Sequence, residues 1–150
     1  MDAKEKKLAE ETISKILEAL LVDGGFELSE DKDVLMVSLT TPDMGVVIGY
    51  HGEILDALQL IFSLSISKKI GRFVRVSVEA GDYKKNRSEY LKTLAEHTKE
   101  RVLADRKEVF LPNLKPWERR IVHLIFQDDP EVVSESVGEG RERTLVVKPR

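Results

Sequence analysis

Two glycines three positions apart, Gly49 and Gly52, enclose Tyr50 and His51 directly before a stretch of helical periodicity. Glycine lets the backbone turn tightly and approach a ligand without obstruction by a Cβ atom, and the start of a helix presents free N–H groups to an anion. Such a turn suits a phosphate group. An ordinary loop has the same pattern, so the surrounding segment must decide between the two interpretations.

A second group of residues with chemical potential lies between Lys115 and His123. Arg119 and His123 are four residues apart and Lys115 lies one turn earlier, so three potential cations share one face of a helix. This face suits phosphate because a guanidinium can donate two parallel hydrogen bonds to an oxyanion. The alternative is structural: His123 has a partner within the fold and Arg119 pairs with an acidic residue. The other face is expected to supply five core residues: Ile121, Val122, Leu124, Ile125 and Phe126.

The sequence contains no constellation for catalysis. Its histidines, His51, His97 and His123, lack the spacing of a metal site, and no Walker-type or nucleophile-elbow motif occurs. The absence of cysteine excludes disulfide bonds, thiolate nucleophiles and Cys-ligated metals. We therefore expect no enzyme, catalytic residue, metal or cofactor. A nuclease is a distant alternative that would require a metal site the sequence does not show.

Charge is distributed unevenly along the chain. Residues 1–81 carry 9 basic and 14 acidic side chains, whereas residues 82–150 carry 15 basic and 13 acidic ones. Between Lys84 and Arg120 there are 11 basic and 6 acidic residues, so contact with phosphate is expected to centre there. A solvated helix face is the simpler alternative. No apolar run is long enough to span a membrane and no signal peptide is evident, so we expect a cytoplasmic protein.

Apolar periodicity and turn residues predict the order α-β-β-α-α-β for the first half of the chain. The first helix is expected to be closed by Gly24 and Gly25. The last helix is expected to have an apolar side formed by Ile54, Leu55, Leu58, Ile61, Phe62 and Leu64. The main predicted ranges are a helix over residues 4–22, strands over 26–29 and 34–40, a helix from 53 to about 70 and a strand over 73–78.

The run from Asp43 to Leu60 resembles the KH domain of the Jag family, which is also called SpoIIIJ-associated protein or KhpB. The resemblance rests on Val47-Ile48-Gly49, Gly52 and Leu55-Asp56-Ala57-Leu58-Gln59. It implies a type II-like KH domain in which Gly49, Tyr50, His51 and Gly52 clamp the RNA backbone and Ile48 flanks the nucleotide groove. Such loops commonly hold Lys or Arg in the middle, so we expect weaker contact with phosphate here and, as a hypothesis, a base stacked on Tyr50.

The second half resembles the R-3-H domain, which is named for its Arg and His and follows the KH domain in Jag proteins. The resemblance rests on Val109 to Pro112, on Pro116 to His123, and on a glycine-containing hairpin that ends in Val146-Val147. It implies binding of single-stranded nucleic acid by a set of basic side chains: Arg119 and His123, their neighbours Lys115 and Arg120, and Arg141 or Arg143 from the hairpin. The small N-terminal Jag domain of the family is not found in this sequence.

We therefore predict an α+β chain with a type II-like KH domain over residues 1–81. A long helix over residues 82–106 is expected to join it to a small α+β R-3-H domain, within residues 82–150. The expected function is binding of single-stranded RNA, or single-stranded DNA. The resemblance further implies a bacterial post-transcriptional regulator linked to the cell envelope and division. The alternative is a scaffold that forms a homodimer, or a heterodimer with a separate single-KH-domain protein.

Overall fold

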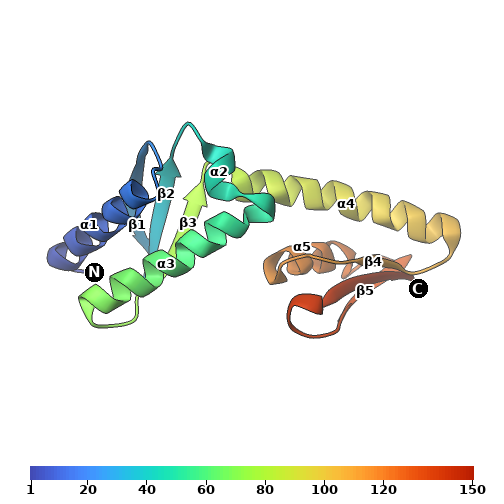
Figure 1. The fold of residues 1–150 in the computed structure, drawn as a ribbon. Coiled ribbons are helices and arrows are strands. Elements are labelled where there is room, and N and C mark those ends of the chain that lie inside the picture. The colour runs from blue at the N-terminus through green and yellow to red at the C-terminus, as the bar shows by residue number, and fades with distance from the viewer. The chain divides into compact units, whose positions relative to one another are not determined.

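The computed structural model describes all 150 residues, and residue contacts divide the chain into two units, Met1–Tyr83 and Lys84–Arg150. Figure 1 shows the helices and strands of each unit. Each unit has its own hydrophobic core. Both units combine helices with a three-stranded sheet, so the predicted α+β class is confirmed. No helix combines the length and the apolar character that crossing a lipid bilayer requires.

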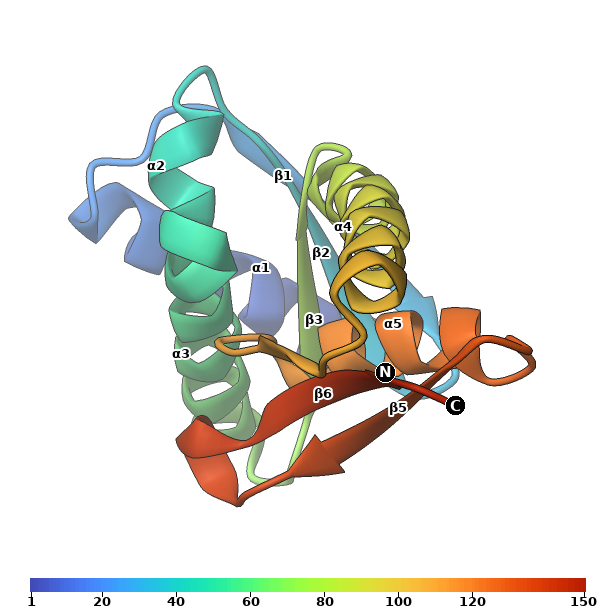
Figure 2. The same ribbon diagram turned by 90° about the vertical axis from the view of Figure 1, so that its right-hand side faces the viewer.

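The first unit has one sheet with the strand order β1-β2-β3, in which β2 is antiparallel to β1 and parallel to β3. Leu35, Val37 and Leu39 alternate along β2 and face the core. The helices of this unit lie on that one face of the sheet (Figure 2). The elements are α1 (Ala3–Ala19), β1 (Gly25–Asp31), β2 (Val34–Thr40), α2 (Met44–Ile48), the 3-10 turn η1 (Tyr50–Gly52), α3 (Glu53–Ile70) and β3 (Arg75–Ala80).

The hairpin of β1 and β2 turns on Lys32 and Asp33, whose φ angles are 46° and 65°. Two central residues with positive φ form a type I′ turn, whose twist matches that of an antiparallel pair. The predicted hairpin is therefore present. Its first strand is longer than expected because Glu30 and Asp31 pair with β2 instead of forming the turn.

Helix α1 ends at Ala19, earlier than the predicted residue 22. Leu21 has a φ of 56°, and the N–H groups of Leu21 and Val22 donate to the carbonyls of Glu18 and Leu17. This is a Schellman ending, usually built on glycine. Gly24 is therefore not the stop that the sequence predicted.

Gly24 is required for a different reason. A Cβ atom at this position would lie 2.0 Å from the carbonyl oxygen of Thr40, at the end of the neighbouring strand. Its φ of 115° also lies outside the range that other residues readily adopt. Glycine therefore allows the chain to pass close to β2 before entering β1.

The six apolar residues with helical spacing in α3 do not share one side of the helix. Ile54, Ile61 and Leu64 are exposed. The core side is formed by Leu55, Leu58, Phe62 and Ile66. Because α3 is apolar on both sides, its periodicity could not identify which side faces the sheet.

In the second unit, β6 is the central strand and pairs antiparallel with both β4 and β5. Helix α4 buries Leu91, Ala95 and Val102 in the same core as Val122 and Phe126 of α5. The long helix, which was expected only to join the two domains, thus also contributes to the core of the second unit. The elements are α4 (Tyr83–Asp105), β4 (Val109–Leu111), α5 (Pro116–Phe126), β5 (Val132–Val137), the 3-10 turn η2 (Gly140–Glu142) and β6 (Thr144–Pro149).

Candidate nucleic-acid interface

Helix α5 carries the Arg119 and His123 side chains. It begins with Pro116, whose missing N–H costs little at the first helical position. The Glu118 carboxylate then accepts a hydrogen bond from the backbone N–H of Lys115 at 3.0 Å. A helix start closed in this way limits fraying of the turn from which Arg119 projects.

The buried side of α5 is narrow. It consists of Glu118, Val122 and Phe126, at a spacing of four residues. Leu124 and Ile125 are exposed, so the prediction that they belong to the core is wrong. A short helix that lies against one sheet and one other helix leaves most of its circumference in solvent.

The Arg119 guanidinium is held by a backbone group. Its Nη1 atom donates to the carbonyl oxygen of Leu114 at 2.6 Å. Arg119 forms no ion pair with any carboxylate, contrary to the structural alternative considered for this residue. A guanidinium has five N–H donors, so further donors remain for an oxyanion.

The His123 side chain is exposed and has one partner in the fold. Its Nδ1 atom lies 2.8 Å from the hydroxyl oxygen of Ser134 on β5, and Ser134 is only 5% exposed. The structural alternative, in which His123 has a partner within the fold, therefore holds for the Nδ1 atom of this ring. The contact fixes the plane of the imidazole and leaves Nε2 for a ligand.

The sequence reasoning missed a buried ion pair beneath this face. Glu118 is fully buried, and its Oε1 atom accepts from Nε of Arg87 on α4 at 2.8 Å. The Arg87 guanidinium also lies 4.8 Å from the centre of the Tyr90 ring. A Glu two residues after a proline at a helix start is the capping signal that could have indicated Glu118, but its partner is 31 positions away.

The other predicted basic residues are not all brought together. Lys115 precedes α5 and Arg120 lies on its exposed surface. Arg141 and Arg143 lie in and directly after η2, both exposed, and Arg143 donates to the carbonyl of Gly138 at 3.3 Å. No hydrogen bond or ion pair links these hairpin arginines to α5.

The Gly49–Gly52 segment forms a tight turn between α2 and α3. Gly49 and Gly52 have φ angles of 69° and 76°, and His51 between them has a φ of 49°. A Cβ atom on Gly49 would lie 2.3 Å from Cγ1 of Ile54. Gly49 is therefore required both for its backbone conformation and for the close approach to α3.

The turn carries the aromatic rings of Tyr50 and His51 and no lysine or arginine. Tyr50 is 73% exposed, and its ring stacks on that of His51 with centroids 4.0 Å apart. Helix α3 begins after Gly52 without a side-chain cap, which leaves backbone N–H groups for a ligand. Glu53 and Asp56 in the first turn oppose phosphate there, and Ile48 is half-buried at the end of α2.

Comparison with known proteins identifies a family for each unit. Residues 6–79 match the KH domain of KhpA/KhpB, and residues 89–149 match the R-3-H domain. The chain is 33% identical to "RNA-binding protein KhpB" of Clostridium symbiosum over 97% of its length and 68% of the relative. It is 29% identical to the protein of that name from Bacillus subtilis over 90% of its length and 66% of the relative. It is 28% identical to the protein of that name from Streptococcus pneumoniae serotype 2, over 90% of its own length and 41% of the relative.

Proposed function

The chain belongs to the family of the RNA-binding protein KhpB, and from this premise we propose that it binds single-stranded RNA through two sites. One is the Gly49–Gly52 turn with Ile48, and the other is the face of α5 that carries Arg119 and His123. The family is not a family of enzymes. The observation that carries the proposal is that Arg119 and His123 lie one turn apart and are each held by one hydrogen bond. Arg119 keeps further N–H donors for a phosphate, and His123 leaves its Nε2 atom for a ligand.

The two sites differ in chemistry. The α5 face has Lys115, Arg119 and Arg120 and suits the RNA backbone. The Gly49–Gly52 turn has an exposed Tyr50 ring and acidic neighbours, and so it suits an unstacked base more than a phosphate. Two weak sites in one chain reinforce each other because the second contact becomes intramolecular.

Further parts of the proposal rest on the family alone. We propose that the protein acts in the cytoplasm as a bacterial post-transcriptional regulator linked to the cell envelope and division. Single-stranded DNA is the competing ligand, and Arg141 and Arg143 extend the R-3-H site where the strand passes the hairpin. Competition between RNA and DNA oligonucleotides of the same sequence tests the preference.

A specific observation favours a second function, protein association through the KH domain. The outer side of α3 exposes Ile54, Leu60, Ile61 and Leu64, although a helix in contact with water is usually polar on that side. Contiguous exposed apolar side chains of this kind mark association surfaces. The partner would be a second copy of the chain or a separate single-KH-domain protein.

Fluorescence anisotropy of a labelled single-stranded RNA, measured over a salt series, tests the two-site proposal. The variants are Tyr50→Asp/His51→Asp and Arg119→Ala/His123→Ala. We expect each to weaken binding about tenfold, and the second also to reduce the salt dependence, whose slope is about 0.7 per neutralised phosphate for a single strand.

His97→Ala/Arg101→Ala is the matched control, because it removes an exposed His and Arg that are also four residues apart, on α4. We expect it to change the affinity less than about twofold. If the control weakens binding as much as Arg119→Ala/His123→Ala, the α5 face has no special role. If no protein binds RNA even at low salt, association becomes the leading function.

A further inference from the structure

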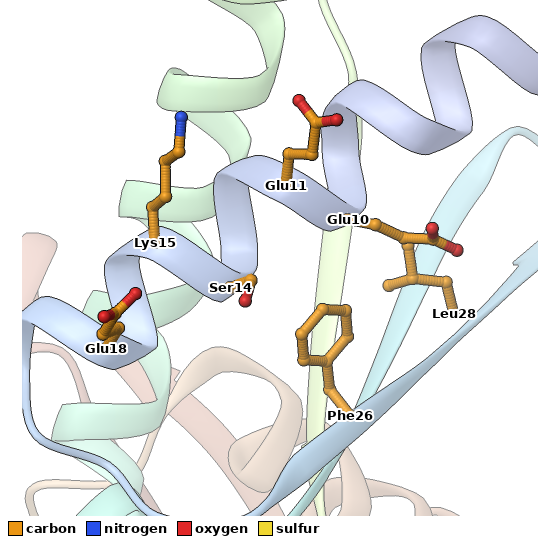
Figure 3. A pocket seen from close by; sticks show the side chains of 7 residues that line it. All are labelled: Glu10, Glu11, Ser14, Lys15, Glu18, Phe26 and Leu28. Atoms are coloured by element: carbon orange, nitrogen blue, oxygen red, sulfur yellow. The ribbon is translucent and has the colours of Figure 1, made fainter.

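A groove separates α1 from β1, the strand at one edge of the first unit's sheet. Figure 3 shows this groove, in which the Phe26 ring stands on β1 and points toward α1. Its volume is about 540 Å³, and a second cavity continues it past the end of α1, with Ser14, Glu18 and Phe26 lining both. The groove thus follows β1 from Leu28 to Gly24.

Strand β1 is an edge strand whose outer backbone has no partner. It pairs only with β2 along its whole length, Gly25–Asp31. An extended peptide can add to such an edge by main-chain hydrogen bonds, and a helix that runs beside the edge provides a second wall for its side chains. Edge strands are commonly protected by charged side chains, lysine above all, or by proline. Strand β1 has no lysine or proline, and its charged residues, Glu27, Glu30 and Asp31, are all acidic, so they would repel an acidic strand and not a basic one.

The side chains that line the groove define its ligand. Phe26 and Leu28 are half-buried and point to the same side of β1, so they form an apolar floor. Glu10, Glu11 and Glu18 lie on the α1 wall, and none of them forms an ion pair. Lys15 is the one cation among the lining residues. Glu27, on the opposite face of β1, adds a further exposed carboxylate.

We propose that α1 and β1 bind an extended, basic segment of a partner protein as an additional strand. Side chains of an extended strand point alternately to the two faces of the sheet. The groove-facing positions of this segment hold apolar residues opposite Phe26 and Leu28 and Lys or Arg opposite the carboxylates of α1, and its outward-facing Lys or Arg residues meet Glu27. RNA does not fit because its phosphates would face these carboxylates. The β1 strand of a second copy is also unfavourable because its Glu27, Glu30 and Asp31 would approach like charges.

The probe for this site is a capped octapeptide that repeats Lys-Lys-Val-Val twice and so presents lysine and valine on both of its faces, titrated into the isotope-labelled intact chain. Backbone amide shifts in the NMR spectrum are expected in β1 and along α1, and not in the second unit. We expect Glu10→Lys/Glu18→Lys to weaken the peptide about tenfold, while RNA binding is retained. Glu89→Lys/Glu96→Lys makes the same change of charge on the exposed surface of α4 and is expected to leave the peptide affinity unchanged.

Three results would overturn the proposal. The first is an absence of shifts in β1 at millimolar peptide, and the second is an equal loss of affinity in both charge variants, which would indicate non-specific attraction. The third is a set of β1 shifts that appears without peptide as protein concentration rises, or on addition of RNA, which would make a second copy or RNA the occupant. A glutamate and valine octapeptide serves as the negative control and is expected not to bind.

Discussion

At the scale of single residues, Ser134 determines the orientation of His123. Its hydroxyl is buried, whereas the histidine ring is exposed, so the serine positions the ring from beneath. An exposed imidazole without this contact would sample several rotamers before binding a ligand, and its ordering would reduce the affinity. Ser134 was not identifiable from the sequence because nothing local distinguishes it from Ser136 on the same strand.

We expect Ser134→Ala to weaken RNA binding by about twofold to twelvefold, the equivalent of one net hydrogen bond of ~0.5–1.5 kcal/mol. Anisotropy with the same labelled RNA measures the effect. Ser136→Ala is the control, because this half-buried serine lies two residues along β5 and its side chain forms no hydrogen bond. Equal affinities for the two variants would show that His123 needs no support from Ser134.

At the scale of elements, the pair of Arg87 and Glu118 joins α4 to α5. Both side chains are largely or fully buried, and Glu118 also closes the start of α5. The pair is therefore a link between the long helix and the helix that carries Arg119. Arg87 precedes residue 89, where the match to the R-3-H family begins, so the structural unit extends beyond the family's boundary.

Arg87→Met is expected to lower the free energy of unfolding of the second unit by ~3–5 kcal/mol, since it leaves a buried carboxylate without its partner. Denaturant unfolding followed by Trp117 fluorescence measures the stability of the second unit, because Trp117 is the one tryptophan of the chain and packs against the second core. Lys148→Met breaks the exposed pair with Glu135 and is the control, expected to have no measurable effect. A similar midpoint for both variants would contradict the proposed link.

The turn between α5 and β5 is closed by Asp129. A hydrogen bond from Lys99 of α4, with further ones from the backbone N–H groups of Glu131 and Val132, lowers the pKa of this carboxyl below its ordinary value of 3.8. The unfolded chain therefore binds the proton more readily than the folded chain. The resulting stabilisation is fully present above that ordinary value and is lost as pH falls through the lowered pKa.

Asp129→Asn is accordingly expected to flatten the pH dependence of unfolding of the second unit in the acid range, below the ordinary carboxyl pKa of 3.8. Trp117 fluorescence in denaturant at a series of pH values checks this. Asp128→Asn, at the exposed neighbouring position, is expected to retain the wild-type slope. If both variants lose the slope equally, the acid sensitivity does not arise from Asp129.

At the scale of the whole molecule, two kinds of recognition are expected to respond differently to salt. RNA binding by the α5 face weakens with salt because it releases counterions, whereas association through the apolar outer side of α3 should change little. The first unit has the greater share of acidic residues and the second the greater share of basic residues. This asymmetry favours protein contacts for the first unit and phosphate contacts for the second.

Leu60→Glu/Leu64→Glu is expected to abolish self-association, because it places carboxylates on the apolar outer side of α3. Sedimentation velocity at tens of micromolar protein and at two salt concentrations measures the oligomeric state. Leu21→Glu changes an exposed leucine at the end of α1 and should leave that state unaltered. A wild-type chain that is monomeric throughout would rule out the homodimer.

By itself, the sequence determined the α+β class, the order of the elements and the two motifs. These features depend on local information: apolar periodicity, a charged turn between two β-prone runs, Pro116 at a helix start, and two glycines that enforce positive φ. Helix ends were less predictable, as α1 illustrates, since Leu21 adopts a conformation that usually belongs to glycine.

Only the tertiary structure decided which side of an apolar helix is buried and which partners the polar side chains find. The two sides of α3 are similarly apolar, so the choice between them depends on how the helix packs on the sheet. Glu118 pairs with Arg87, 31 positions away in the sequence, and His123 contacts Ser134, 11 positions away. No local pattern encodes such pairs. The open edge of β1 likewise follows from the order of strands, which long-range packing sets.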